Sequence, residues 1–475
     1  MMSTLNFDTS ASGASVSAVP PVTDALGRFV ATLAWHDVPR HIRELMPVLL
    51  IDMFRAAAAG KDRPWTRAAT TLYGDHASGR QAQLFFSDTQ VDVSRAAFVN
   101  GVACGSLDWD DSHVAAIIHP GVVIWPAALA MAQATGASGR DLLTAVLAGY
   151  ETAIRIGMAI QPEHSLRGFQ GTPTCGAFGA AAACARLLGL SAEGCRNALG
   201  IAATFACGIS QFFVSGSDIK RLHAGKAAAN GVEAALLAHG GLSGPHDAIE
   251  GKQGFSRAFS DRYDPATTLD GLGQHYPTEW ISLKPHAGSV RMQSAIEAAA
   301  VLARQGVTFD QIATIEIGVH GAMVGKLTAN QPVDNQQAQL STPFAVAMAM
   351  ALTPSRSGPL ALSIDDFEAS MNDVRIKDLA SRTYCVVDAE VERLTTAEAV
   401  PARVACMLKD GSRQEAFIEH PKGCPQNPMT ADEVGARFLT IAGPLLGDSA
   451  CRDWLAHARR IEHLPDVSAL FTLRH

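Results

Sequence analysis

Apolar residues recur every three or four positions through residues 21–277, which is the spacing of one face of an α-helix. After Pro39 the spacing continues as far as Gly60, and Gly or Pro breaks separate the later helical segments. Helices are predicted over Val22–Leu33, Val122–Ala134, Gly139–Met158, Cys175–Leu188, Ala192–Ser210 and Gly225–His239. Because strand signals are nearly absent here, residues 21–277 predict a large all-helical domain packed through Ala and Gly contacts.

The pattern changes after residue 278, where alternation of apolar and polar residues replaces helical spacing. Asp410–Gly411 lies between two alternating runs and is typical of a β-hairpin turn. Strands are predicted at Ile312–Val319, Cys385–Val391, Arg403–Leu408 and Gln414–Glu419, and helices at Ser289–Arg304 and Thr342–Leu352. Residues 278–425 therefore predict a smaller α+β lid domain.

The two ends of the chain differ from both domains. Residues 1–20 are rich in Ser, Ala and Thr without an apolar period, which predicts a disordered tail. Helical spacing returns at Ala431–Ile441 and Ser449–Arg459, so residues 426–475 are expected to return to the helical domain.

The composition limits the classes of protein to which this chain can belong. The 475 residues are 48% hydrophobic and 18% charged, enough apolar material for a sizeable core. The net charge of −8 disfavours a nucleic-acid partner, which needs a basic surplus. Nine cysteines without a C-x-x-C pair indicate reduced thiols in a cytoplasmic protein. No run of 18 residues is judged apolar enough for a membrane span, and no secretory signal is evident.

Four polar clusters interrupt otherwise apolar, small-residue sequence. They are Leu107–His113 with Ile118–Gly121, Arg167–Thr172, Ser217–Gly225 and Leu283–Arg291. Each has a structural alternative, since Asp and Thr cap helices and basic turns are often solvated. The first cluster is the hardest to explain in that way, because three Asp, two His and a Trp crowd between two apolar helices.

The residue types in these clusters favour acid–base chemistry on a polycarboxylate. Cations bind carboxylates and hold enolate-like charge, while Asp or His moves protons. Asp108, His113 and His119 could in principle bind a metal, but their spacing matches no zinc pattern, so we expect none. The chain has no P-loop, no G-x-G-x-x-G motif after a strand and no G-x-S-x-G motif, which argues against nucleotide and serine-hydrolase chemistry.

At these clusters the sequence resembles the MmgE/PrpD family, which contains 2-methylcitrate dehydratases, cis-aconitate decarboxylases and iminodisuccinate epimerase. The matching stretches are LDWDDSHVAAIIHPGVVIWPAALA, GYETAIRIG, TCGAFGAAAACARLLGL, IKRLHAGKAAANGVEAALLAHGGLSGP and KDGSRQEAFIEHPKGCPQNPMTADEV. The likeness covers nearly the whole chain. It implies a large helical domain with a smaller α+β lid, a homodimer, an active site between the domains, and no metal or organic cofactor.

The resemblance also assigns residues. It implies catalytic roles for Asp108 and His119 in the L-D-x-D-D and H-P motifs, and for Lys220 and Lys284. Tyr150, Glu151 and Arg155 match a G-Y-E stretch and are expected to be structural. Expected substrate-binding residues are Ser112, which stands where many members have Thr, together with Gln170, His223, His286 and Arg291.

Two of these residues depart from the family pattern. Gln170 and Arg291 stand where many members have His, although His286 lies close to the second position. Gln cannot exchange protons near pH 7, and Arg is permanently cationic. These departures leave proton transfer to Asp108, His119, Lys220 and Lys284, and favour a diverged substrate or reaction.

The leading hypothesis is a cofactor-independent lyase of the dehydratase type, acting on a small di- or tricarboxylate. A base removes the proton α to a carboxylate, and the β-hydroxide then leaves. In this hypothesis His119 is the principal acid/base, Asp108 its partner, and Lys220, Lys284 and Arg291 are carboxylate clamps. The alternatives are an epimerase of an amino- or imino-dicarboxylate, a cis-aconitate-type decarboxylase, and a non-catalytic carboxylate-binding protein.

Overall fold

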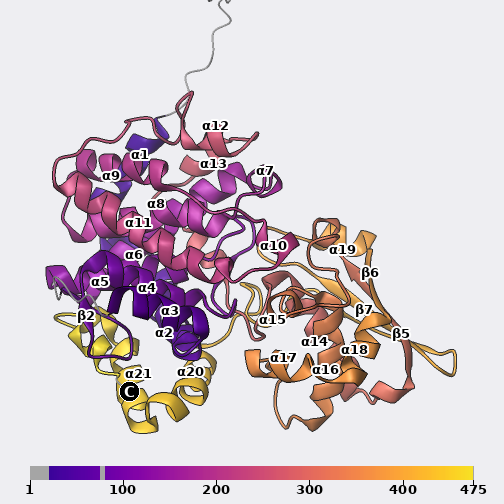
Figure 1. Ribbon diagram of the computed structural model, residues 1–475. Helices are drawn as coiled ribbons and strands as arrows, with labels where there is room; N and C mark the ends of the chain where they lie inside the picture. Colours follow the sequence, from indigo (N-terminus) through magenta and orange to yellow (C-terminus); the bar gives the residue numbers. More distant parts are fainter. Residues whose placement is uncertain (1–20, 75–80, 474–475) are drawn as a thin grey trace, which may run out of the picture.

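A computed structural model describes residues 21–74 and 81–473. The predicted disordered tail, 1–20, lies outside the described residues. The chain forms a large helical part and a smaller α+β part, as predicted (Figure 1). The helical part contains α1 (Val22–Thr32), α2 (Arg40–Gly60), α3 (Pro64–Gly74), α4 (Val93–Gly105), α5 (Gly121–Thr135), α6 (Gly139–Ile160), α7 (Glu163–Leu166), α8 (Gly171–Leu187), α9 (Ala192–Phe205), α10 (Phe212–Ser215), α11 (Ile219–His239), α12 (Phe255–Phe259) and α13 (Pro265–Leu269).

Small residues let the central helices of this part approach closely. Helix α11 packs against α4 and α8, and Gly101 of α4 lies opposite Gly225 of α11. A Cβ on Gly225 would collide with the backbone oxygen of Phe98, and one on Gly231 would collide with Ala180. The Ala- and Gly-rich composition is thus explained by backbone-to-backbone packing.

The lid is a four-stranded sheet with helices packed against it. Its elements are α14 (Gln293–Arg304), β5 (Ile312–Val319), α15 (Asn335–Ala338), α16 (Thr342–Leu352), α17 (Ile364–Ser370), α18 (Val374–Ser381), β6 (Thr383–Val387), α19 (Ala389–Leu394), β7 (Ala402–Leu408) and β8 (Arg413–Ile418). The strand order is β6-β5-β7-β8, with β5 parallel to β6 and the other pairs antiparallel. The β7–β8 hairpin turns at Asp410–Gly411, as the sequence predicts.

Among the contacts between the lid and the helical part, a strand pair and the C-terminal helices bear on the site. A short ribbon pairs β3 (Ser112–His113) with β4 (Ile281–Ser282), which places the first polar cluster beside the fourth. Helices α20 (Ala431–Leu446) and α21 (Asp448–Arg459) follow the lid and pack against α2 (Figure 1). Residues far apart in the sequence therefore meet where the two parts join.

Several predicted boundaries are wrong for local physical reasons. The strand expected at Cys385–Val391 ends at Val387, because the Asp388 side chain accepts hydrogen bonds from Glu390 and Val391 and begins α19. Helix α9 ends at Phe205 rather than Ser210, and α8 begins at Gly171. Helix α11 begins at Ile219, six residues before the prediction, so the third polar cluster lies in its first turns.

The membrane expectation also needs a correction. Helix α6 is long and apolar enough to cross a membrane by length and composition, with a mean hydropathy of 1.3 over its best window. However, 94% of that window is buried inside the protein. The helix is a core element of the helical part, in contact with α8.

The close crossing of α4 and α11 predicts that a side chain at position 225 destabilises the protein. We expect Gly225→Ala to lower the free energy of unfolding by about 1–3 kcal/mol, because the methyl group overpacks a backbone contact. Urea unfolding followed by circular dichroism measures this change. Gly240→Ala is the control, because its Cβ would lie at an ordinary 3.4 Å from the Leu237 oxygen. Equal stability of the two variants would contradict the close crossing.

Candidate active site

The loop between α4 and α5 carries three aspartates close together in the sequence, at the junction of the two parts. Asp108, Asp110 and Asp111 are all buried there. Asp108 has φ +52°, in the left-handed region that Asp tolerates better than most residues. This turn directs the neighbouring carboxylates to different partners.

The Asp108 carboxylate is shared by two lysines from distant segments. Lys220 in α11 donates from Nζ to Oδ2, and Lys284 donates to Oδ1 at 2.9 Å and to the Asp108 backbone oxygen at 2.7 Å. Burial alone would raise the pKa of Asp108, but Lys220 and Lys284 hold it well below its usual range. Asp108 is therefore ionised.

The two lysines differ in their electrostatic surroundings. Burial lowers the pKa of Lys220, and the attraction of Asp108 only partly opposes it, with Arg221 and Lys284 adding repulsion. Burial acts in the same direction on Lys284, but Asp108 and Asp110 together raise its pKa. Lys220 is thus the easier of the two ammonium groups to deprotonate.

His119 has one ring nitrogen anchored and the other facing the cluster. Its Nδ1 lies 2.9 Å from Asp110 Oδ2, 3.1 Å from the Asp111 backbone oxygen and 3.0 Å from Ser112 Oγ. A carboxylate and a carbonyl only accept hydrogen bonds, so Nδ1 carries the proton. Nε2 lies 3.8 Å from Asp108 Oδ1 and is the free basic nitrogen.

Asp110 has a role that the sequence did not identify. The predicted partner of His119 was Asp108, but the carboxylate on Nδ1 is that of Asp110, which also lies 3.7 Å from Lys284 Nζ. Burial would raise the pKa of Asp110, yet Lys284 and His119 bring it below its usual value. A carboxylate in this place fixes the ring orientation and stabilises the imidazolium.

Asp111 belongs to a separate pair, with Tyr150. Its carboxyl accepts hydrogen bonds from Tyr150 OH at 2.7 Å and from the Gly121 backbone at 3.0 Å. Burial raises the pKa of Asp111 to about 7, although the Tyr150 bond opposes this. The pair ties the loop to the start of α5, two residues after His119.

Three of the predicted substrate-binding residues lie beside this cluster. Ser112 contacts His119, and Gln170, which precedes α8, bonds to His223 Nδ1 through its Oε1. Burial, with a contribution from Lys220, lowers the pKa of His223 to about 4, so its ring is neutral. Phe212 packs against this ring.

The other two predicted binding residues form no hydrogen bond or ion pair with the cluster in the described segments. His286 is buried, its Nδ1 accepts from the Leu362 backbone at 3.1 Å, and burial lowers its pKa to about 3. This bond holds the ring against the lid, while Nε2 has no hydrogen-bond partner among the described residues. Burial also lowers the pKa of Arg291, whose guanidinium has no ion pair within residues 21–74 and 81–473.

The cluster contains atoms of the kind that bind metals, so their arrangement can be compared with what a metal ion requires. Ligand atoms of Asp108, Asp110 and His119 lie within 4.8 Å of one another. However, Lys220 and Lys284 already occupy both oxygens of Asp108. A divalent cation would have to displace two ammonium groups, so these residues do not fit a metal as they are arranged.

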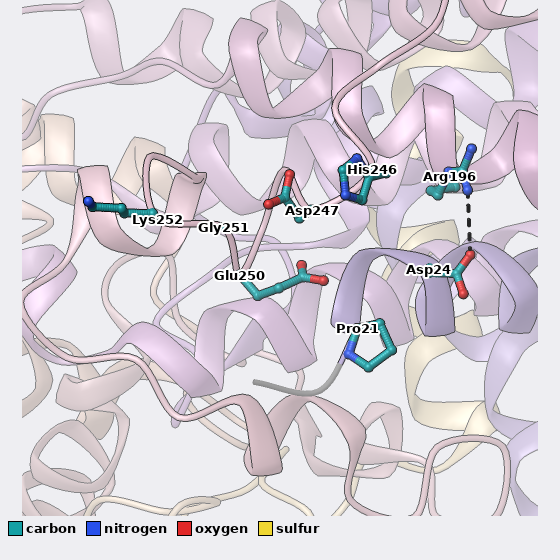
Figure 2. A pocket seen from close by; sticks show the side chains of 8 residues that line it. All are labelled: Pro21, Asp24, Arg196, His246, Asp247, Glu250, Gly251 and Lys252. Atoms are coloured by element: carbon teal, nitrogen blue, oxygen red, sulfur yellow. Dashed lines mark ion pairs between the residues drawn. The ribbon is translucent and has the colours of Figure 1, made fainter. Parts of the chain in front are cut away.

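A cavity of about 550 Å³ lies elsewhere, between the start of α1 and the segment 246–252 (Figure 2). Its lining mixes both signs of charge and includes Asp24 and Arg196, which lie 3.8 Å apart. It is lined by Pro21, Asp24, Arg196, His246, Asp247, Glu250, Gly251 and Lys252. It shares no residue with the Asp108 cluster and is not the predicted site.

Comparisons with known proteins agree with the resemblance. The model of the MmgE/PrpD N-terminal domain matches residues 24–268, and that of the C-terminal domain matches 286–462. A cis-aconitate decarboxylase-like protein, oryM, of Aspergillus oryzae is 27% identical, over 95% of this chain and 97% of its own length. Cis-aconitate decarboxylase of Aspergillus terreus is 24% identical over 95% of both chains. The Homo sapiens enzyme of that name is 28% identical over 81% of this chain and 80% of its own.

The raised pKa of Asp111 predicts a pH dependence of stability. Because the native state holds this proton up to about pH 7 while an unfolded Asp releases it near pH 4, stability falls as pH rises between these values. We expect Asp111→Asn to remove a slope of up to about 1.4 kcal/mol per pH unit. Urea unfolding from pH 4.5 to 7.5 measures it.

Asp410→Asn is the control for this experiment. Hydrogen bonds from Ser412 lower the pKa of Asp410 in the native state, so its contribution to stability is lost only as pH falls below about 4. This variant should therefore keep the wild-type slope between pH 4.5 and 7.5. Parallel stability curves for wild type and Asp111→Asn would contradict the assignment.

Proposed function

The chain belongs to the MmgE/PrpD family, and we propose that it is a lyase that cleaves a bond next to a carboxylate of a small di- or tricarboxylate. The observation that carries the proposal is the buried Asp108 carboxylate held between Lys220 and Lys284, with the free Nε2 of His119 beside it. Anion-binding cations and a free base in one cluster are the two requirements of carbanion chemistry.

The balance of charge suits an anionic substrate. Lys220, Lys284 and Arg221 supply three cations, whereas Asp108 and Asp110 are ionised and Asp111, whose pKa burial raises to about 7, carries only part of a charge near neutral pH. The cluster therefore keeps a positive surplus that a substrate carboxylate can neutralise. The side chains of His119 and Lys220 are 22% and 11% exposed, so these two groups are accessible to the substrate.

The proposed steps use each group in the state described. Nε2 of His119 takes the proton α to a carboxylate, and Asp110 stabilises the imidazolium through Nδ1. Lys220 and Lys284 face the enolate-like charge that develops, where a preorganised cation lowers the barrier most. The imidazolium or the ammonium of Lys220 then returns a proton to the leaving group or to carbon.

Two bond cleavages suit these groups. Elimination of β-hydroxide, the reaction predicted from the sequence, follows the proton abstraction described above. Loss of carbon dioxide, suggested by the names of the relatives, instead generates the carbanion by breaking the C–C bond, and the imidazolium or the Lys220 ammonium then protonates that carbon. Gln170 supports a substrate that differs from theirs, because its amide bonds to His223 and offers only hydrogen bonds at this position. We propose that the preferred substrate differs where it faces Gln170 and His223.

We also propose an oligomeric state and a cellular environment. The resemblance implies a homodimer, which light scattering after size exclusion would test. All nine cysteines are free and seven are buried, which supports a reducing, cytoplasmic environment. No cofactor is included in the proposal, because Lys220 and Lys284 occupy the carboxylate that a metal would need.

Proton NMR in deuterium oxide tests the proposed function. We expect the protein to convert at least one of cis-aconitate, 2-methylcitrate, citrate, isocitrate and malate, or to exchange its α-proton. New vinyl signals indicate elimination, carbon dioxide indicates decarboxylation, and exchange without net reaction indicates epimerisation. Inertness toward every compound would contradict the proposal.

Variants of the two lysines test whether that activity depends on the cluster. Lys220→Met and Lys284→Met each remove a charge-assisted contact of about 1.5–3 kcal/mol, so kcat/KM should fall roughly 10- to 100-fold. The fall should include kcat, because the contact strengthens as charge develops. Circular dichroism checks the fold of each variant. Kinetics close to wild type would remove that lysine from the site.

The proposed divergence makes Gln170 a separate test. We expect Gln170→His to leave cis-aconitate and 2-methylcitrate poor substrates and to slow the best substrate of the panel, because the bond to His223 Nδ1 is altered. Steady-state rates on all five compounds measure this. A variant that converts cis-aconitate faster than wild type would show that only the imidazole was missing.

A further inference from the structure

We propose that Gln339, a buried lid residue between α15 and α16, is a positioning residue that sets Asp108, Lys220 and Lys284 relative to one another. The inference deepens the proposed function, on which its kinetic test rests. Among the described residues Gln339 forms no hydrogen bond with any of the three charged side chains. It bonds to the residues directly beside Asp108 and Lys220, and to Ser289 in the segment that follows Lys284.

The three contacts come from three separate segments. Gln339 Nε2 donates to the backbone oxygen of Leu107 at 2.6 Å, and Leu107 directly precedes Asp108. Gln339 Oε1 accepts from Arg221 Nη2 at 2.8 Å, and Arg221 directly follows Lys220. The Gln339 backbone oxygen accepts from Ser289 at 3.3 Å, in the segment that begins with Lys284.

The third contact is reinforced by the backbone around Gly288. The Gly288 N–H donates to the Asp108 backbone oxygen at 3.1 Å, the same oxygen that accepts from Lys284 Nζ. Gly288 has φ +142°, and a Cβ there would lie 2.7 Å from the Gln339 oxygen. The backbones of residues 288 and 339 therefore meet with no space for a side chain.

The hydrogen-bond partners of the Gln339 side chain require an amide at this position. A carbonyl only accepts and a guanidinium only donates, so the residue between them must donate at one end and accept at the other. The same two partners fix which end of the amide carries oxygen. Gln339 is 1% exposed, so water cannot replace either bond.

The arrangement lets one lid side chain hold two parts of the helical domain. Leu107 lies after α4, and Arg221 lies in the first turn of α11, where its guanidinium also stacks 5.1 Å from the Trp65 ring. Loss of the amide removes the hydrogen bonds that hold both segments, although all three charged side chains are still present. The distances around the Asp108 carboxylate would then relax.

The experiment compares Gln339→Met with Gln336→Met. Gln336 is a matched control because it is buried one turn earlier and neither polar atom of its side chain has a hydrogen-bond partner among the described residues. Gln339→Glu is the second variant. It keeps the acceptor for Arg221, loses the donor to Leu107, and differs from wild type by a single atom type.

The first measurement needs no substrate. Brief acetylation with acetic anhydride, followed by peptide mass spectrometry, reports the reactivity of each lysine. We expect Lys220 and Lys284 to react at least threefold faster in Gln339→Met and Gln339→Glu than in wild type. Lys61, whose side chain is 9% exposed, and the exposed Lys226 should be unchanged, and so should every lysine in Gln336→Met.

The second measurement uses the best substrate of the panel. We expect kcat to fall at least tenfold in Gln339→Met, with KM within threefold of wild type and Gln336→Met close to wild type. Unchanged reactivity of Lys220 and Lys284 in folded Gln339 variants would overturn the proposal, as would an equal rise at Lys61. If wild type converts no compound, the proposed function fails while the acetylation result still decides the role of Gln339.

Discussion

The site depends on one electrostatic constraint, the burial of the Asp108 carboxylate between two ammonium groups. Removing a carboxylate from water costs several kcal/mol unless it is paired and hydrogen-bonded. Lys220 and Lys284 satisfy Asp108, yet they lie 112 and 176 residues away in the sequence. The pairing therefore requires the helical part and the lid junction to meet at one place. Both the close packing of α4 against α11 and the β3–β4 ribbon help to bring the two lysines to Asp108.

The C-terminal helices contribute to that meeting point. Trp109, next to Asp108, interacts with two guanidinium groups, those of Arg55 at 4.7 Å and of Arg437 of α20 at 5.4 Å from its ring centroid. Its indole N–H donates to the Pro285 oxygen at 3.1 Å, and Arg437 donates to the Lys284 oxygen at 2.9 Å. The return of the chain to the helical part thus supports both the aspartate loop and the segment that carries Lys284.

Much of this could be predicted from the sequence, because polar clusters inside apolar, small-residue segments are costly unless they meet. The four clusters were identifiable in this way, and the resemblance to the MmgE/PrpD family assigned roles to Asp108, His119, Lys220 and Lys284 within them. Helices and strands of clear period were placed to within six residues at the ends compared above. The partner of His119 was not identifiable, because Asp108 and Asp110 differ by two positions along an irregular loop with a left-handed residue. The sequence does not show that the Nδ1 of His286 accepts from the Leu362 backbone, because a buried His bonded to backbone and a ligand-binding His have the same sequence signal. Gln339 gave no signal at all, since its importance depends entirely on what the lid brings near it.

The three aspartates of the loop show how one segment can hold groups of different charge. Lys284 lies within 4 Å of both Asp108 and Asp110, and the nearest basic ring, His119, bonds to Asp110. Those two carboxylates are therefore ionised. Asp111 faces Tyr150 and the Gly121 N–H, which donate hydrogen bonds without bringing a charge, so burial decides its state. A third ionised carboxylate would cancel the positive surplus that binds an anion. Because burial raises the pKa of Asp111 to about 7, this carboxyl is mostly neutral below that pH and preserves most of the surplus there, while it fixes the turn that carries His119.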